Sequence, residues 1–220
     1  MFKIFFLLSG LLQSLVNSNG INNLQPVATV RTIVTDQRLA GSWNAGAIDI
    51  KFELLPKSDL MKPKDSTDAQ LPLGDTREQQ AFLEKCYAVT LRENNASYVL
   101  VGSLTRINNQ LYMDLMPLGI KFKDKLEDGG LGFSPEYLTT FNIARISLDR
   151  NGSMSLQILR GDFIKEQVLS GRMMLKHVYE PLYNSFLVTA SSFELHQFLE
   201  KYGHDERFFD QATVFTKKGS

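Results

Sequence analysis

The sequence predicts a mainly β fold, either an antiparallel up-and-down barrel or a strongly curled sheet, with two or three short helices. First, apolar and charged residues alternate across Ala47–Leu55, as they do in a strand with one buried face. Second, short asparagine-rich turns separate several of the later strand-like segments, which is typical of antiparallel neighbours. Third, strands follow strands without intervening helices, which disfavours a doubly wound α/β fold.

The first eighteen residues have the order of a secretory signal peptide. Lys3 provides a positive charge, residues 4–16 form a mostly apolar run, and small polar residues follow. A bilayer span needs roughly 20 apolar residues, so this run is too short for a permanent anchor. We expect cleavage after Ser18 or Gly20, with no nearby cysteine to carry a lipid. The predicted product is soluble, periplasmic or extracellular; the alternative is a short buried helix that opens a cytoplasmic domain.

The composition limits the kind of protein further. Hydrophobic residues make up 43% of the chain, which is enough for a packed core. The 24 basic and 24 acidic side chains balance, so the basic excess that nucleic-acid binding needs is missing. Cys86 is the only cysteine, which excludes an internal disulfide. We expect it to be a small buried residue of a strand, the alternative being a reactive thiol.

The chain after the signal is predicted to hold a leader segment, 19–35, followed by a single domain, 36–220. The leader is polar at its start and is expected to be loose. Residues 27–38 lack a decisive period and form either a short helix or a strand. Prolines and charges then indicate a long surface loop over 56–75, and a helical turn or two is expected over 76–85. Three strands follow, separated by the asparagine-rich turns: 86–93, 97–106 and 110–117.

The second half of the domain begins with another long irregular loop, 119–134. Asn151-Gly152 is the strongest hairpin signal in the chain, so the segments on either side of it, 138–150 and 153–159, should pair. A brief helix capped by Asp162 is expected over 161–170. The clearest helix, 193–202, is predicted from its apolar stripe, from a cap at Ser191 or Ser192, and from Gly203 at its end. The remaining strands are expected at 173–179, 186–189 and 212–217.

The segment 36–43 ends in Gly41-Ser42-Trp43, just before the first clean strand. It resembles the opening of lipocalin-like barrels, in which the tryptophan plugs the closed end, so Trp43 is expected to be structural. The later order of strands and closing helix, with Leu187–Ser192 leading into 193–202, resembles that of small exported bacterial proteins of unassigned function. The resemblance implies no catalytic residues. The helix at 161–170 departs from a plain lipocalin and argues against an open ligand cup.

No catalytic, metal or cofactor motif is present in the sequence. The three histidines lack the spacing of a metal site, and there is no nucleophile elbow, zinc-protease motif or phosphate-binding glycine loop. We therefore predict no catalytic residue, no metal and no cofactor. Sequons at Asn95 and Asn151 fall in expected turns, where a glycan would be sterically possible. The residues that we consider for ligand contact are Tyr112, Asp114, Arg145 and His177.

Two of these candidates have alternative interpretations. Asp114 interrupts an apolar strand beside aromatic residues, where a raised pKa would suit a general base. More commonly such a carboxylate lies on the solvent face and pairs with a basic side chain on the next strand. Arg145 either meets an anionic group of a ligand or extends to the rim of the barrel.

These observations favour an exported, non-enzymatic binding protein. Its partner would be an apolar or amphipathic small molecule held by the barrel, or an envelope protein bound through the long loops. One alternative is a small hydrolase or isomerase that uses Asp114 with a histidine. Another is a structural partner subunit, which would carry an exposed apolar patch. Nucleic acid is not an expected partner, and no integral membrane span is expected after cleavage.

Overall fold

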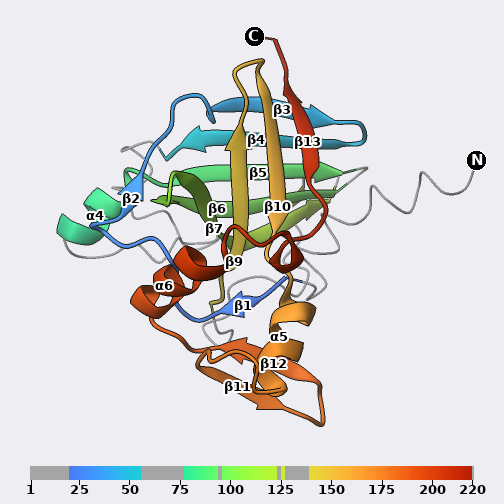
Figure 1. Ribbon diagram of the computed structural model, residues 1–220. Coiled ribbons are helices and arrows are strands. Elements are labelled where there is room, and N and C mark those ends of the chain that lie inside the picture. Colours follow the sequence, from blue (N-terminus) through green and yellow to red (C-terminus); the bar gives the residue numbers. More distant parts are fainter. Residues whose placement is uncertain (1–19, 56–76, 94–95, 123–124, 127–138, 220) are drawn as a thin grey trace, which may run out of the picture.

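The computed structural model of the protein describes residues 20–55, 77–93, 96–122, 125–126 and 139–219. Within these ranges most elements are strands, accompanied by three short α-helices, so the predicted mainly β class is confirmed (Figure 1). The expected signal peptide, 1–18, and the expected loop, 56–75, lie outside the described residues. No helix in the described part of the chain is long and apolar enough to cross a membrane.

Eight antiparallel strands close into a barrel in the order in which the chain forms them. Each strand pairs with the next, and the last of them, β13, returns to pair with the first, β3. In Figure 1, β3, β4, β5 and β6 run behind β9, β10 and β13 and cross them at a steep angle. The eight strands are β3 (Gly41–Ala45), β4 (Ile48–Leu54), β5 (Tyr87–Glu93), β6 (Ala96–Ile107), β7 (Gln110–Phe122), β9 (Asn142–Leu148), β10 (Ser153–Ile158) and β13 (Thr213–Lys217).

Strand β7 is longer than its sequence pattern predicts. It continues to Phe122 and pairs with the two-residue strand β8 (Lys125–Leu126), so the expected loop 119–134 begins as strand. A β-bulge causes the difference: Val99 pairs with Gly119, whereas its neighbour Leu100 pairs with Pro117. The extra residue on β7 disrupts the ladder locally and shifts the register of the pairing. The sequence prediction therefore ended the strand at the bulge.

Side chains fill the barrel interior. Alternate residues of β4, namely Ile48, Ile50 and Phe52, point inward and are almost completely buried. Trp43 belongs to the same core, and its Nε1–H donates to the Leu39 carbonyl oxygen at 2.8 Å. An eight-stranded barrel is just wide enough for side chains to fill. The further members of this core are Leu39, Tyr87, Val89, Leu91, Leu100, Leu104, Leu111, Met113, Leu115, Ala144, Ile146, Met154, Leu156, Ile158 and Phe215.

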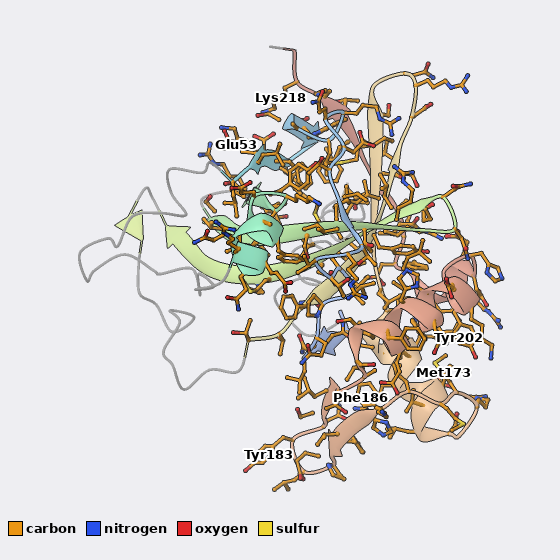
Figure 2. The ribbon with its side chains drawn as sticks, turned by 90° about the vertical axis from the view of Figure 1, so that its left-hand side faces the viewer. Glu53, Met173, Tyr183, Phe186, Tyr202 and Lys218 are labelled. Atoms are coloured by element: carbon orange, nitrogen blue, oxygen red, sulfur yellow. The ribbon has the colours of Figure 1, made fainter. Side chains whose placement is uncertain are left out.

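The chain between β10 and β13 forms a second unit at one end of the barrel, which we call the cap (residues 159–212). Strand β1 (Asn22–Asn23) joins it by pairing in parallel with β12. Figure 2 shows the cap below the barrel, with Met173, Phe186 and Tyr202 within it and Tyr183 at its far end. The elements of the cap are α5 (Gly161–Leu169), β11 (His177–Glu180), β12 (Ser185–Val188), α6 (Ser192–Tyr202) and the 3-10 turn η1 (Glu206–Phe208).

The two cap helices differ in how well the sequence predicted their ends. Helix α6 begins after Ser191, whose Oγ accepts from the Glu194 N–H, and Gly203 follows its last residue, both as expected. Helix α5 begins at Gly161, as predicted, but its cap residue differs from the prediction. Its N-cap residue is Arg160, which provides no side-chain cap, while Asp162 lies in the first turn and pairs with Arg160. The prediction of Asp162 as the cap was wrong.

Residues 20–34, here called the N-terminal segment, are packed against the barrel and the cap, contrary to the expected loose leader. Ile21, Asn23 and Val27 are buried, and the segment ends in β2 (Ile33–Val34), which pairs with β6. Its two strands are too short to give a periodic sequence pattern. Long-range contacts hold it in place instead, including the hydrogen bond from Thr105 Oγ1 to the Thr32 carbonyl oxygen, 3.0 Å.

Candidate functional site: a pocket on the outer face of the barrel

Strands β6 and β7 present a second, outward-facing set of side chains. The residues that flank Leu104 and Met113 in the sequence point away from the barrel core, because successive side chains of a strand alternate between its two faces. On β6 these outward residues include Val101 and Ser103, and on β7 they include Asp114. The N-terminal segment crosses this face, so the outward residues are covered rather than solvated.

Asp114 fixes the N-terminal segment to β7. Its Oδ1 accepts from the Val27 N–H at 2.9 Å, and its Oδ2 accepts from the Ala28 N–H at 2.8 Å and from the Ser103 hydroxyl at 3.3 Å. The Asp114 side chain is only 1% exposed. Burial raises the pKa of this carboxyl to about 6, although the three hydrogen bonds act in the opposite direction. The expected solvent-facing position of Asp114 is therefore wrong, and its partners are backbone amides rather than a basic side chain.

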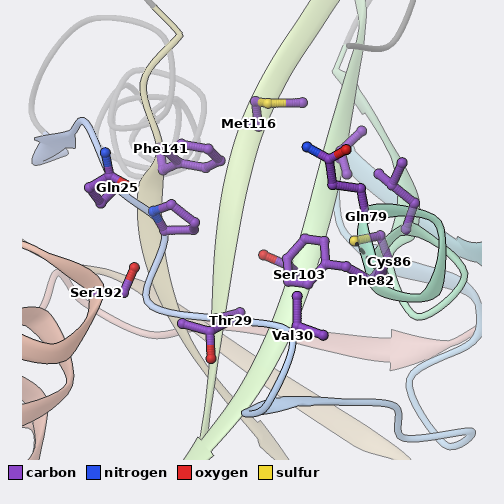
Figure 3. A pocket seen from close by; sticks show the side chains of 14 residues that line it. Gln25, Thr29, Val30, Gln79, Phe82, Cys86, Ser103, Met116, Phe141 and Ser192 are labelled. Carbon is purple, nitrogen blue, oxygen red and sulfur yellow. Dashed lines mark hydrogen bonds between the residues drawn. The ribbon is translucent and has the colours of Figure 1, made fainter. Parts of the chain in front are cut away.

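A pocket with a volume of about 400 Å³ opens beside this carboxylate, here called the outer pocket (Figure 3). The N-terminal segment forms one wall, helix α4 (Arg77–Leu83) forms the opposite wall, and β6 and β7 form the floor. Phe141, which precedes β9, and Ser192 of the cap complete the pocket. The described lining residues are Gln25, Pro26, Ala28, Thr29, Val30, Gln79, Phe82, Leu83, Cys86, Val101, Ser103, Met116, Phe141 and Ser192.

The lining of the outer pocket is mostly apolar. Aromatic and aliphatic side chains dominate, and the polar groups are hydroxyls and amides; the described lining residues include no charged side chain. Cys86 also faces the pocket, and burial raises the pKa of its thiol to about 12. A thiol with this pKa stays protonated at neutral pH and is a poor nucleophile. Cys86 is buried, as predicted, but it lies immediately before β5 rather than within the strand.

Tyr112 and Arg145 meet beneath the end of α6, away from the outer pocket. They are directly opposite each other on β7 and β9, and both donate to the Gly203 carbonyl oxygen, at 3.2 and 3.1 Å. Arg145 also pairs with Glu206 at 2.6 Å and lies 4.1 Å from the centroid of the Phe209 ring. The guanidinium beside Glu206 lowers the pKa of that carboxyl. The Arg145 side chain thus joins the cap to the barrel wall.

His177 is separate from these clusters. His177 lies on β11, where its Nδ1 is 2.8 Å from the Leu175 carbonyl oxygen and its ring stacks on Phe186 at 5.1 Å between centroids. Among the described residues, no three His, Cys, Asp or Glu side chains are grouped closely enough to hold a metal ion. Of the two sequons, Asn151 is exposed in the turn between β9 and β10, and Asn95 lies outside the described residues.

The structure therefore brings two of the candidate residues together and separates the others. Tyr112 and Arg145 share a carbonyl partner in the cap. Asp114 lies on the same face of β7 as Tyr112 but binds the N-terminal segment, and His177 is on β11. Trp43 is inside the barrel core. Sequence reasoning missed the outer pocket itself. Its one local signal in the sequence is the adjacent apolar pair Phe82 and Leu83 within the expected helical segment 76–85, because its other walls come from segments far apart in the chain.

The fold and the site together define a closed eight-stranded antiparallel barrel with a helical cap and an apolar pocket on its outer face. No protein-family model, curated protein or solved structure matches the chain. The resemblance to lipocalin-like barrels accordingly stays a prediction from residues 36–43.

Proposed function

We propose that the protein is an exported, non-enzymatic binding protein that takes an apolar or amphipathic small molecule in the outer pocket. The observation that carries this proposal is the pocket itself. It is concave, its volume is about 400 Å³, and its apolar walls include a few hydroxyl and amide groups. Pockets for small molecules usually have this composition, with the polar groups setting orientation. The barrel interior, by contrast, is occupied by core side chains.

The chemistry of the polar groups near the pocket supports binding rather than catalysis. A general base needs a free oxygen within reach of the substrate proton. Both oxygens of Asp114 already accept backbone N–H groups, and its described contacts include no histidine. The Cys86 thiol is protonated at neutral pH because of its raised pKa. These contacts argue against the hydrolase or isomerase alternative.

Export is part of the proposal, and the packing of the N-terminal segment favours one of the two cleavage sites. Gly20 forms a bridge with Arg160 of the cap, and Ile21 is only 2% exposed. Cleavage after Gly20 would remove that bridge and place a charged amino terminus on a buried residue, which is costly. Cleavage after Ser18 leaves both contacts intact.

The alternative of a structural partner subunit has one observation in its favour. The turn between β11 and β12 carries Leu182 and Tyr183, which are 80% and 79% exposed. β11 is also an edge strand of the cap sheet, with β12 on its other side. Exposed edges and apolar turns are sites where another chain can pair. A Leu182→Ser/Tyr183→Ser double variant should lower the assembled fraction in sedimentation experiments if this surface binds a partner.

A dye titration tests the proposed function. Nile red, an uncharged apolar dye, should bind the protein and gain fluorescence. Val101→Phe places a larger side chain on the pocket floor and should weaken dye binding at least about tenfold, because the phenyl ring occupies the space of the ligand. Val214→Phe is the matched control, since Val214 is exposed on β13 and does not line the outer pocket.

The outcome is interpretable when both variants give the far-ultraviolet circular dichroism of the parent chain. Dye binding that is equal in the two variants, or absent from the parent chain, would rule out the outer pocket as the binding site. Native mass spectrometry of the protein purified from its own host gives an independent readout, in which a co-purifying small molecule should be present in the parent chain and lost in Val101→Phe.

A further inference from the structure

Ser103 is the polar residue on the floor of the outer pocket. Figure 3 shows its hydroxyl near the middle of the view, with Gln25 and Phe141 on one side and Phe82 and Gln79 on the other. The Ser103 hydroxyl donates its single hydrogen to Asp114 Oδ2 at 3.3 Å. A hydroxyl oxygen has two acceptor lone pairs in addition to its hydrogen. Because Asp114 takes the hydrogen, Ser103 can offer a ligand only an acceptor.

The surroundings of Ser103 disfavour a charged ligand. The described lining of the pocket contains no basic side chain that could pair with an anion and no acidic side chain that could pair with a cation. Moving an unpaired charge out of water into apolar surroundings is costly. The Asp114 carboxylate, one hydrogen bond behind Ser103, adds repulsion against an anion. It is itself buried and held by amides, so it is not available to a cation as a direct partner.

We propose that the ligand is an uncharged amphiphile whose hydroxyl or amide group donates a hydrogen bond to Ser103 Oγ. Its apolar body lies against the hydrophobic lining, formed chiefly by Phe82, Val101, Met116 and Phe141. This assignment rests on the proposed function of the outer pocket and makes it specific. It separates the expected ligands from fatty acids and from alkylamines, which carry a charge at neutral pH.

Displacement of Nile red by three matched amphiphiles tests the charge preference on the parent chain. At about pH 8, decanol is neutral whereas decanoate and decylammonium are charged. Decanol should displace the dye at a concentration at least about tenfold lower than either ion, because only the ions lose hydration without gaining a partner. Equal or better displacement by decanoate or decylammonium would overturn the ligand assignment and leave the pocket's binding role intact. Failure of Nile red to bind at all would instead overturn the proposed function.

A chemical comparison isolates the hydrogen bond to Ser103. Decyl methyl ether keeps the oxygen and the chain of decanol but has no donor, so it should bind about threefold to tenfold more weakly. Ser103→Ala should remove this difference, so that decanol and the ether bind the variant with equal affinity, as expected for a coupled pair. Ser155→Ala on β10 is the control, because Ser155 does not line the pocket. Equal affinities of decanol and the ether for the parent chain would contradict the assignment, whether or not the Ser103 variant folds.

Discussion

Asp114 shows how one side chain can hold an entire segment. The N–H groups of two successive residues, Val27 and Ala28, would be buried donors without partners if this carboxylate were absent. Buried amides without partners cost about 1–3 kcal/mol each. The carboxylate satisfies both donors at once, and it thereby positions the wall of the outer pocket that these residues form.

The pKa of Asp114 predicts a specific dependence of stability on pH. Its folded-state pKa of about 6 is above its usual value of 3.8, so the folded protein binds the proton more readily than the unfolded chain. This contribution to the free energy of unfolding is fully present below the usual pKa of 3.8. As the pH then rises to about 6, the free energy of unfolding should fall by about 2–3 kcal/mol. Urea denaturation from acid to neutral pH measures it.

The Asp114→Asn variant is the comparison for this measurement. Asparagine does not titrate, so the fall in stability between the two pKa values should disappear from its profile. Its amide NH₂ group would face the backbone donors of the N-terminal segment, so the variant should also be less stable near neutral pH, by about 1–3 kcal/mol. A variant profile that keeps the same slope would assign the dependence to another group.

At the scale of elements, the end of α6 determines how the cap joins the barrel. Gly203 follows the helix and lies so close to β7 that an ideal Cβ on it would be 2.1 Å from the Tyr112 hydroxyl oxygen and 2.4 Å from the Leu199 carbonyl oxygen. The φ of Gly203 is −65°, a value open to any residue, so space rather than backbone conformation requires glycine here. The helix end and the strand approach each other more closely than a side chain permits.

Gly203→Ala should therefore lower the free energy of unfolding by about 1–3 kcal/mol, the usual cost of overpacking. Gly219→Ala is the control, because its Cβ would meet nothing within 4 Å. Adding Tyr112→Phe removes the nearest atom of the clash, so the double variant should recover part of the loss. Thermal unfolding of Gly203→Ala, of Tyr112→Phe and of the double variant measures this coupling. Additive losses would show that Tyr112 is not what excludes the methyl group.

The elements that sequence reasoning predicted well are those whose signals are local. The capping box of α6 involves residues three positions apart, and the Asn151-Gly152 hairpin is a single turn. The predictions that failed depended on distant contacts. The cap of α5 is Arg160 rather than Asp162, and Gly161 beside it packs against the Gly20 carbonyl, where a Cβ would come within 2.6 Å of the oxygen. The full length of β7 is set by its partner β6 across a bulge.

The same distinction explains the candidate site. The sequence identified Asp114 as unusual within its strand, but its two amide partners are 87 and 86 positions away in the chain. Alternation along β7 places Asp114 and Tyr112 on one face without indicating which face is covered. The outer pocket could not be predicted because its walls come from the N-terminal segment, α4, β6, β7 and the cap.

For the whole molecule, the proposed export makes a direct prediction about the mature chain. Amino-terminal sequencing of protein secreted by its own host should begin at Asn19, because this leaves Gly20 paired with Arg160 and Ile21 buried. A Gly161→Ala variant provides a second check on the same contact, since it crowds the Gly20 carbonyl and should destabilise the mature protein. A mature chain that begins at Ile21 would contradict the packing argument, and an uncleaved chain would contradict export.

The return of β13 to β3 has a consequence for when the fold can be completed. Thr216 and Asn44, which are joined across this seam, are 172 positions apart. Contacts this distant form slowly, because the entropy of closing the intervening loop is lost before the contact contributes any favourable free energy. A growing chain that lacks its last residues has seven of the eight strands and two open edges. During synthesis the barrel can therefore close only after the carboxyl-terminal strand has been made.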